Sequence, residues 1–124
     1  MAIVVLLIAV LFQRVVSYAI MAVMELLKKC KAILESSYKS QFKGLILYGS
    51  MARNQASPGS DIDLLVLLGE PFDYVRELRR IIELLYPIQL EADSLISAKP
   101  ASRDGFERGA IQLYRNAKRE GVAV

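Results

Sequence analysis

The stretch that decides the fold of this chain is LYGSMARNQASPGSDIDLL, residues 47–65. A short apolar segment ends at Gly49-Ser50, ten residues follow, and Asp61-Ile-Asp63 opens a second apolar segment. Side chains at positions i and i+2 of a strand share a face, so this spacing predicts that Asp61 and Asp63 lie side by side. At about 6.5 Å and an effective dielectric of about 20, the two carboxylates repel by about 2.5 kcal/mol, a cost that a divalent cation between them offsets.

The Gly-Ser pair is a candidate phosphate-binding turn. Residues 51–60 are predicted to form a short helical turn followed by a Ser-Pro-Gly loop, and backbone N–H groups at the start of a helix attract phosphate. Gly49 lets the chain approach a ligand closely, and the Ser50 hydroxyl is a further donor, although a role as a helix cap explains it equally well. Arg53, one turn on, either contacts a phosphate oxygen or is a surface charge. An Asp-x-Asp pattern by itself is more often a solvated junction between loop and strand.

Taken together, Gly49-Ser50 and Asp61-Ile-Asp63 resemble the motif pair of the DNA polymerase beta-like nucleotidyltransferase superfamily. They are most similar to minimal nucleotidyltransferase (MNT) domains, which are often the antitoxin halves of HEPN/MNT toxin–antitoxin pairs. Ala52-Arg53 and Ser60 fit the same pattern, and the resemblance extends over about residues 24–124, including the C-terminal run from Leu113 to Val122. It implies an α/β (α+β) fold with a small mixed β-sheet flanked by helices.

The resemblance also implies an activity: Mg²⁺-dependent transfer of a nucleoside monophosphate, expected to be AMP, from an NTP such as ATP to an acceptor hydroxyl on a HEPN-type toxin. Asp61 and Asp63 would hold two Mg²⁺ ions about 3.5–4 Å apart. The nucleotide would be bound by four residues: Gly49, Ser50, Arg53 and Ser60.

Members of this family use a third acidic residue on a later strand. Leu90-Glu-Ala-Asp-Ser94 offers two candidates on one face of a strand that we expect over residues 88–96. The resemblance favours Asp93, with Glu91 as the alternative, to complete the second metal site and take the acceptor's proton. The alternative interpretation is that both are solvated acids on an edge strand.

Two other functions stay open at this point. One is a protein-binding antitoxin module of the same fold with weak or no catalysis. The other is a small-molecule adenylyltransferase of the aminoglycoside-modifying kind, which is disfavoured because 124 residues leave no room for the additional domain that holds the drug. The acceptor, the base of the NTP and the oligomeric state are left undetermined by the sequence.

The amino-acid composition excludes several classes of metal site and catalytic site. The chain has no histidine, which excludes His-ligated zinc and Ser-His-Asp hydrolysis, so any metal is a hard cation bound by oxygen. Its one cysteine, Cys30, can form no intramolecular disulfide. A net charge of +3 without a dense basic stripe is too mild to indicate direct nucleic-acid binding.

The first 23 residues are set apart from the domain at residues 24–124. Residues 2–12 are uninterrupted apolar residues, followed by Gln13 and Arg14 and then by further apolar residues up to Met24. The segment is a membrane helix with Arg14 near its middle, a signal sequence without leading positive charge, or an extension from an early start codon. We favour the extension, with Met21 or Met24 as the true beginning, and expect a cytoplasmic protein without membrane attachment.

Hydrophobic periodicity predicts the remaining elements. Expected helices cover residues 15–38, 72–86 (ended by Pro87) and 106–118; expected strands cover 44–48, 62–68 and 88–96; residues 97–104 are expected to be a loop and 121–124 a tail.

Overall fold

The computed structural model describes residues 1–53 and 59–124. The elements, in chain order, are α1 (Ala2–Tyr38), the 3-10 helix η1 (Lys39–Gln41), β1 (Phe42–Tyr48), β2 (Ile62–Leu68), α2 (Tyr74–Glu91), β3 (Ile96–Ser102), α3 (Arg103–Arg108), α4 (Gln112–Glu120) and β4 (Val122–Ala123).

The strands form a mixed four-stranded sheet in the order β3-β2-β1-β4. Strand β1 runs antiparallel to β2 and β4, whereas β2 and β3 are parallel. The register pairs Tyr48 with Asp63 across β1 and β2. The expected α/β (α+β) architecture with a small mixed sheet flanked by helices is therefore confirmed.

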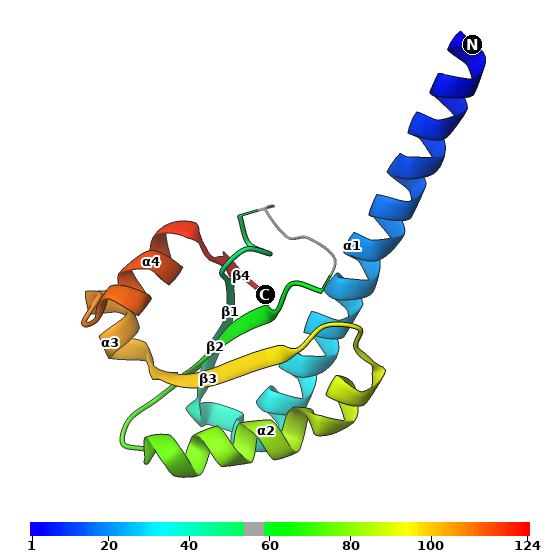
Figure 1. The fold of residues 1–124 in the computed structure, drawn as a ribbon. Helices are drawn as coiled ribbons and strands as arrows, with labels where there is room; N and C mark the ends of the chain where they lie inside the picture. The colour runs from blue at the N-terminus through cyan, green and yellow to red at the C-terminus, as the bar shows by residue number, and fades with distance from the viewer. Residues whose placement is uncertain (54–58) are drawn as a thin grey trace.

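Helices cover both faces of the sheet (Figure 1). On one face α1 and α2 pack against alternate residues of β1 and β2, and this larger core includes Leu34, Leu64 and Ile81, all fully buried. On the other face a smaller core of Leu65, Leu67 and residues from α3 and α4 lies at one end of the sheet. Strand β2 carries apolar side chains on both faces and is buried at nearly every position, as predicted for residues 62–68.

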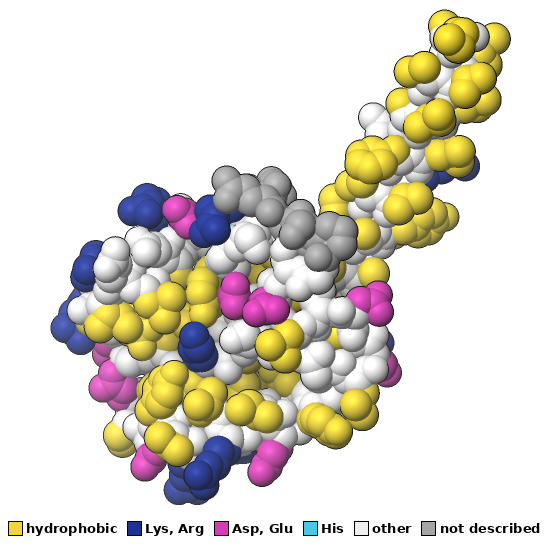
Figure 2. Space-filling model, viewed as in Figure 1, with side chains coloured by type: hydrophobic (Ala, Val, Ile, Leu, Met, Phe, Trp, Pro, Cys, Tyr) yellow, Lys and Arg dark blue, Asp and Glu magenta, His cyan; other side chains and the backbone are white. Residues whose placement is uncertain are grey.

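The N-terminal part of α1 projects away from the domain, and apolar side chains surround it (Figures 1 and 2). Every residue up to Ala22 is exposed, and the first contact with the core is made by Val23. By length and composition this helix is apolar enough to cross a membrane, a test that an N-terminal signal sequence also passes. The expected boundary between residues 23 and 24 stays a prediction.

The prediction of a strand over residues 88–96 is wrong. Helix α2 continues through Pro87 to Glu91, because Pro87 is exposed while Ile88 packs in the core and prolongs the buried face. The Gln89 amide then holds the chain after the helix, donating to the Ser94 carbonyl (3.0 Å) and accepting from the Ile96 N–H (2.7 Å). The third strand therefore begins only at Ile96, the last residue of the expected strand, and runs to Ser102 through the segment expected to be a loop.

Two further differences concern the ends of elements. The helix expected over 106–118 is two helices, because Gly109 adopts a left-handed conformation (φ 64°) that ends α3. The expected C-terminal tail contains β4, which pairs with Ile46 and Leu47 of β1.

Candidate active site

The glycine of the Gly-Ser pair lies directly against the carboxylate of Asp63. Gly49 follows β1 with a φ of 76°, a conformation that side chains other than hydrogen disfavour. A Cβ at this position would overlap Oδ2 of Asp63 and lie 3.2 Å from its Cγ. The antiparallel pairing of Tyr48 with Asp63 brings the two motif halves together. The turn therefore lies against the carboxylate of Asp63.

The electrostatics of the acidic pair are those of two neighbouring carboxylates. Asp61 is exposed just before β2, and Asp63 is half-buried. Burial, and then the charge of Asp61, raise the pKa of Asp63 above its usual value; Lys99 and Arg53 act in the opposite direction. Acidic side chains gather near the middle of the face shown in Figure 2. A divalent cation would relieve the repulsion, and oxygen ligands of this kind suit Mg²⁺.

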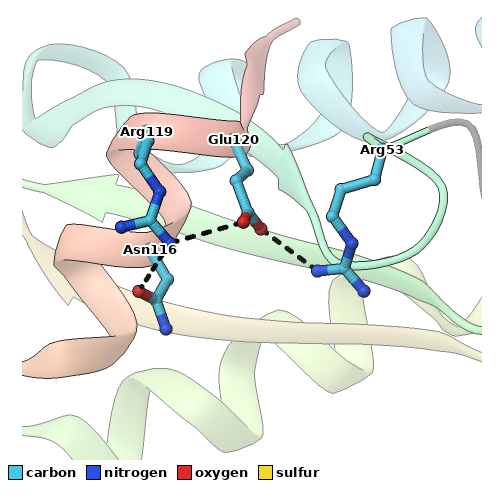
Figure 3. A network of polar contacts seen from close by, with 4 residues as sticks. All are labelled: Arg53, Asn116, Arg119 and Glu120. Atoms are coloured by element: carbon cyan, nitrogen blue, oxygen red, sulfur yellow. Dashed lines mark hydrogen bonds and ion pairs between the residues drawn. The ribbon is translucent and has the colours of Figure 1, made fainter.

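Arg53 lies in the turn that follows Gly49, where its N–H donates to the Gly49 carbonyl (3.3 Å). Its side chain points to the end of α4, where Nη1 donates to Oε2 of Glu120 (3.1 Å); Arg119 binds the other oxygen of Glu120 and also Asn116 (Figure 3). This contact ties the turn to α4. Ser50 and Ser60 are half-buried beside it, whereas residues 54–58 of the expected loop lie outside the described residues.

Neither candidate for the third acid lies on a strand, so the basis for choosing them was wrong. Glu91 ends α2 and is exposed, with Oε2 paired to Nζ of Lys29 on α1 (3.2 Å). Asp93 is exposed in the connection that follows. Among residues 1–53 and 59–124, no three acidic, histidine or cysteine side chains come close enough together to hold a metal ion. The described residues therefore contain no preformed cluster that includes Asp93 or Glu91, and the role of either residue as a third metal ligand stays a prediction.

The strand that does lie beside the acidic pair is β3, which sequence reasoning missed. Its register places Ser97 next to Asp63 and Lys99 next to Leu65. Pro100 and the small residues around it weaken the strand signal, and Pro100 is tolerated because β3 is an edge strand. A strand placed from residue 96 rather than 88 would have identified both side chains.

Aromatic residues complete this side of the site. The pKa of Tyr48 is raised by burial, then by the charge of Asp63 and by Tyr74 at the start of α2. Tyr114 of α4 is likewise influenced by Tyr74. Tyr48 and Tyr114 both pack against the smaller core, on the face of β2 that also carries Asp63.

Comparisons with known proteins also indicate a nucleotidyltransferase. Residues 27–117 match the model of the nucleotidyltransferase domain. The chain belongs to this family. Among curated proteins of Methanocaldococcus jannaschii, one named "Putative protein adenylyltransferase" is 36% identical over 89 residues, or 71% of this chain and 83% of the relative. A second protein with that name is 32% identical over 77 residues, 62% of this chain and 77% of the relative. The predicted membership among nucleotidyltransferases is confirmed.

Solved structures share the fold of this nucleotidyltransferase domain. A crystal structure of a toxin–antitoxin with AMP-PNP superposes with a TM-score of 0.53 at 18% identity, covering 76% of this chain and 68% of that one. A mutant of the toxin–antitoxin MntA-HpeT gives a TM-score of 0.51, also at 18% identity, covering 77% of this chain and 70% of that one. At this identity the likeness concerns the fold alone.

Proposed function

We propose that this nucleotidyltransferase is an MNT-type antitoxin that transfers AMP from Mg·ATP to a hydroxyl group of a HEPN-type toxin. The observation that carries the proposal is the contact between the Gly49 turn and the Asp63 carboxylate. A phosphate-binding turn and a metal-binding pair are useful together only if one ligand spans both, and a metal-bound triphosphate is such a ligand.

Asp61 and Asp63 are the residues that would hold Mg²⁺. Their carboxylates supply hard oxygen ligands, and the raised pKa of Asp63 reflects a site that gains from added positive charge. When bound, the ion would neutralise the triphosphate and favour charge development on the departing group. Sequence reasoning implied two such ions, but the second depended on a third acid that the described residues do not bring to the site.

The backbone N–H groups of Gly49 and Ser50 would bind the outer phosphates, and Arg53 and Ser60 would contact the nucleotide from the same turn. In the transfer, the acceptor oxygen bonds to the α-phosphorus and the bond from that phosphorus to the β-bridging oxygen breaks. Pyrophosphate leaves with the electron pair, and the acceptor's proton passes by way of a site aspartate to water. Such catalysis is mainly positioning and electrostatics, which a domain of this size can provide.

A toxin partner is supported by the toxin–antitoxin complexes that share the fold, and a protein acceptor by the names of the archaeal relatives. We propose a cytoplasmic location, where ATP and such a toxin would both be found, and no direct binding of nucleic acid.

The second candidate is a partner-binding module with little catalysis. It is favoured by the absence, among the described residues, of a cluster of three acidic side chains. Such a module would bind its toxin without labelling it.

The test is label transfer. The chain is co-purified with a candidate HEPN-type toxin and incubated with Mg²⁺ and ATP labelled at the α-phosphate. Label is expected on the toxin with the wild type and not with the Asp61→Asn, Asp63→Asn double variant. Asp104→Asn, the same change at an exposed acid in the first turn of α3, is the matched control and should label normally. A complex that forms without any labelling would support the binding module instead.

A further inference from the structure

The strand beside the acidic pair carries a lysine on the face where a third carboxylate was expected. Paired residues of neighbouring strands share a face, so Ser97, Lys99 and Ala101 lie on the side of Asp63. The packing agrees with this assignment, because Ala101 belongs to the small core with Leu65 and Leu67. Residue 97 thus offers a hydroxyl, and residue 99 an ammonium, where an acid would complete a second metal site.

Lys99 is half-buried. Within the described part of the chain, its ammonium has no hydrogen bond or ion pair. Its charge nevertheless acts on Asp63, lowering the pKa of that carboxyl against the effect of burial and of Asp61. The lysine therefore stands near the acidic pair with its donors available to another anion. Its flexible four-carbon stem allows the ammonium to reach one.

We propose that Lys99 replaces the second metal ion, so that the site takes one Mg²⁺, held by Asp61 and Asp63, with the ammonium of Lys99 bound to the α-phosphate of the nucleotide. This inference rests on the proposed function, since it concerns the nucleotide in the same site.

The charge balance of the site supports the exchange. A third carboxylate and a second Mg²⁺ together add a single positive charge, because the carboxylate carries one negative charge and the ion two positive ones. A lysine adds the same single positive charge with one residue. A second divalent ion next to the ammonium would instead meet repulsion without the carboxylate that normally compensates it. The arrangement on β3 therefore favours one ion and disfavours two.

The decisive experiment counts metal ions, with Mn²⁺ as the probe. Wild-type protein is saturated with α,β-methylene-ATP, which cannot undergo transfer, and titrated with Mn²⁺ while free Mn²⁺ is followed by electron paramagnetic resonance. We expect one tightly bound Mn²⁺ per bound nucleotide. The Lys99→Glu variant restores an acid on this face and should bind two. Lys43→Gln, a charge loss at the far end of β1, is the matched control and should behave as the wild type.

Kinetics supply a second measurement. Lys99→Gln should lower kcat for AMP transfer by about 10²–10³-fold, the usual effect of losing one preorganised donor to a developing charge, while Lys99→Arg should restore most of the rate. If Lys99 acted only in packing, Lys99→Arg and Lys99→Gln would have similar kcat values and would bind the same number of metal ions.

The outcomes separate this inference from the function on which it rests. Two Mn²⁺ ions per nucleotide in the wild type, or an unchanged kcat in Lys99→Gln, would overturn the role of Lys99 and leave the nucleotidyltransferase assignment standing. Failure of the wild type to bind nucleotide at all would overturn both.

Discussion

Replacing Gly49 by alanine tests the geometry on which the site depends. The new Cβ would overlap Oδ2 of Asp63, and the backbone φ of 76° is itself unfavourable for alanine. The left-handed conformation costs about 1–2 kcal/mol. To regain ordinary contact, the Asp63 carboxylate must move by about 1 Å, and a displacement of that size in a reacting assembly lowers the rate by about 10²-fold.

Gly59 is a natural control because it shares the backbone conformation but not the contact. Its φ is 85°, and among residues 1–53 and 59–124 a Cβ there would meet nothing within 4 Å. Gly59→Ala should therefore lose about 1–2 kcal/mol in urea unfolding, and Gly49→Ala at least as much, because its Cβ must also displace the Asp63 carboxylate. Only Gly49→Ala should also lose Mn²⁺·ATP affinity and, in the label-transfer assay, about 10²-fold in rate.

The refuting result is equally clear. If Gly49→Ala binds Mn²⁺·ATP and transfers label within about threefold of Gly59→Ala, the contact with Asp63 does not position a working carboxylate, and the argument for the site from the Gly49 turn is wrong.

Three further predictions concern charge, burial and the N-terminal helix. Burial and then the charge of Asp61 raise the pKa of Asp63 in the folded protein, so the stability that protonated Asp63 contributes is complete below the unfolded pKa of 3.8 and is lost as the pH rises through the folded pKa. Without divalent ions, Asp63→Asn should therefore gain stability relative to the wild type between about pH 4 and 7. A difference in the free energy of urea unfolding that stays constant with pH would contradict this. Tyr38 donates to the buried carboxylate of Glu77 (3.4 Å), so Tyr38→Phe should reduce the free energy of unfolding by about 1–3 kcal/mol, whereas Tyr86→Phe at an exposed position should change it by less than about 0.5 kcal/mol, and equal effects would argue against this hydrogen bond. Deletion of residues 2–20, all exposed, should leave the free energy of unfolding unchanged within about 0.5 kcal/mol; a large loss in thermal or urea unfolding would show that the helix supports the domain.

The features that could be predicted from the sequence are those encoded within a short stretch of chain. Gly49 and Asp63 lie at facing ends of two strands that pair antiparallel, so their meeting follows from the local connection. The run at 62–68 is apolar at almost every position, and a segment buried on both faces carries that pattern in its own residues. Family membership follows from the same motifs, and the matching family model confirms it.

The segment from Pro87 to Ser102 was decided by tertiary structure. Residues 88–91 alternate as a strand would, yet Ile88 gains more by extending the buried face of α2, and the Gln89 amide delays the strand until Ile96. A weak strand signal around Pro100 becomes a strand because the long apolar β2 offers its free edge for pairing. This pairing places Lys99, rather than an acid, beside Asp63. The spacing of residues along the chain determines which nearby side chains share a face. The register of β3 against β2 is determined by packing, and this register decides that Lys99 lies beside the site.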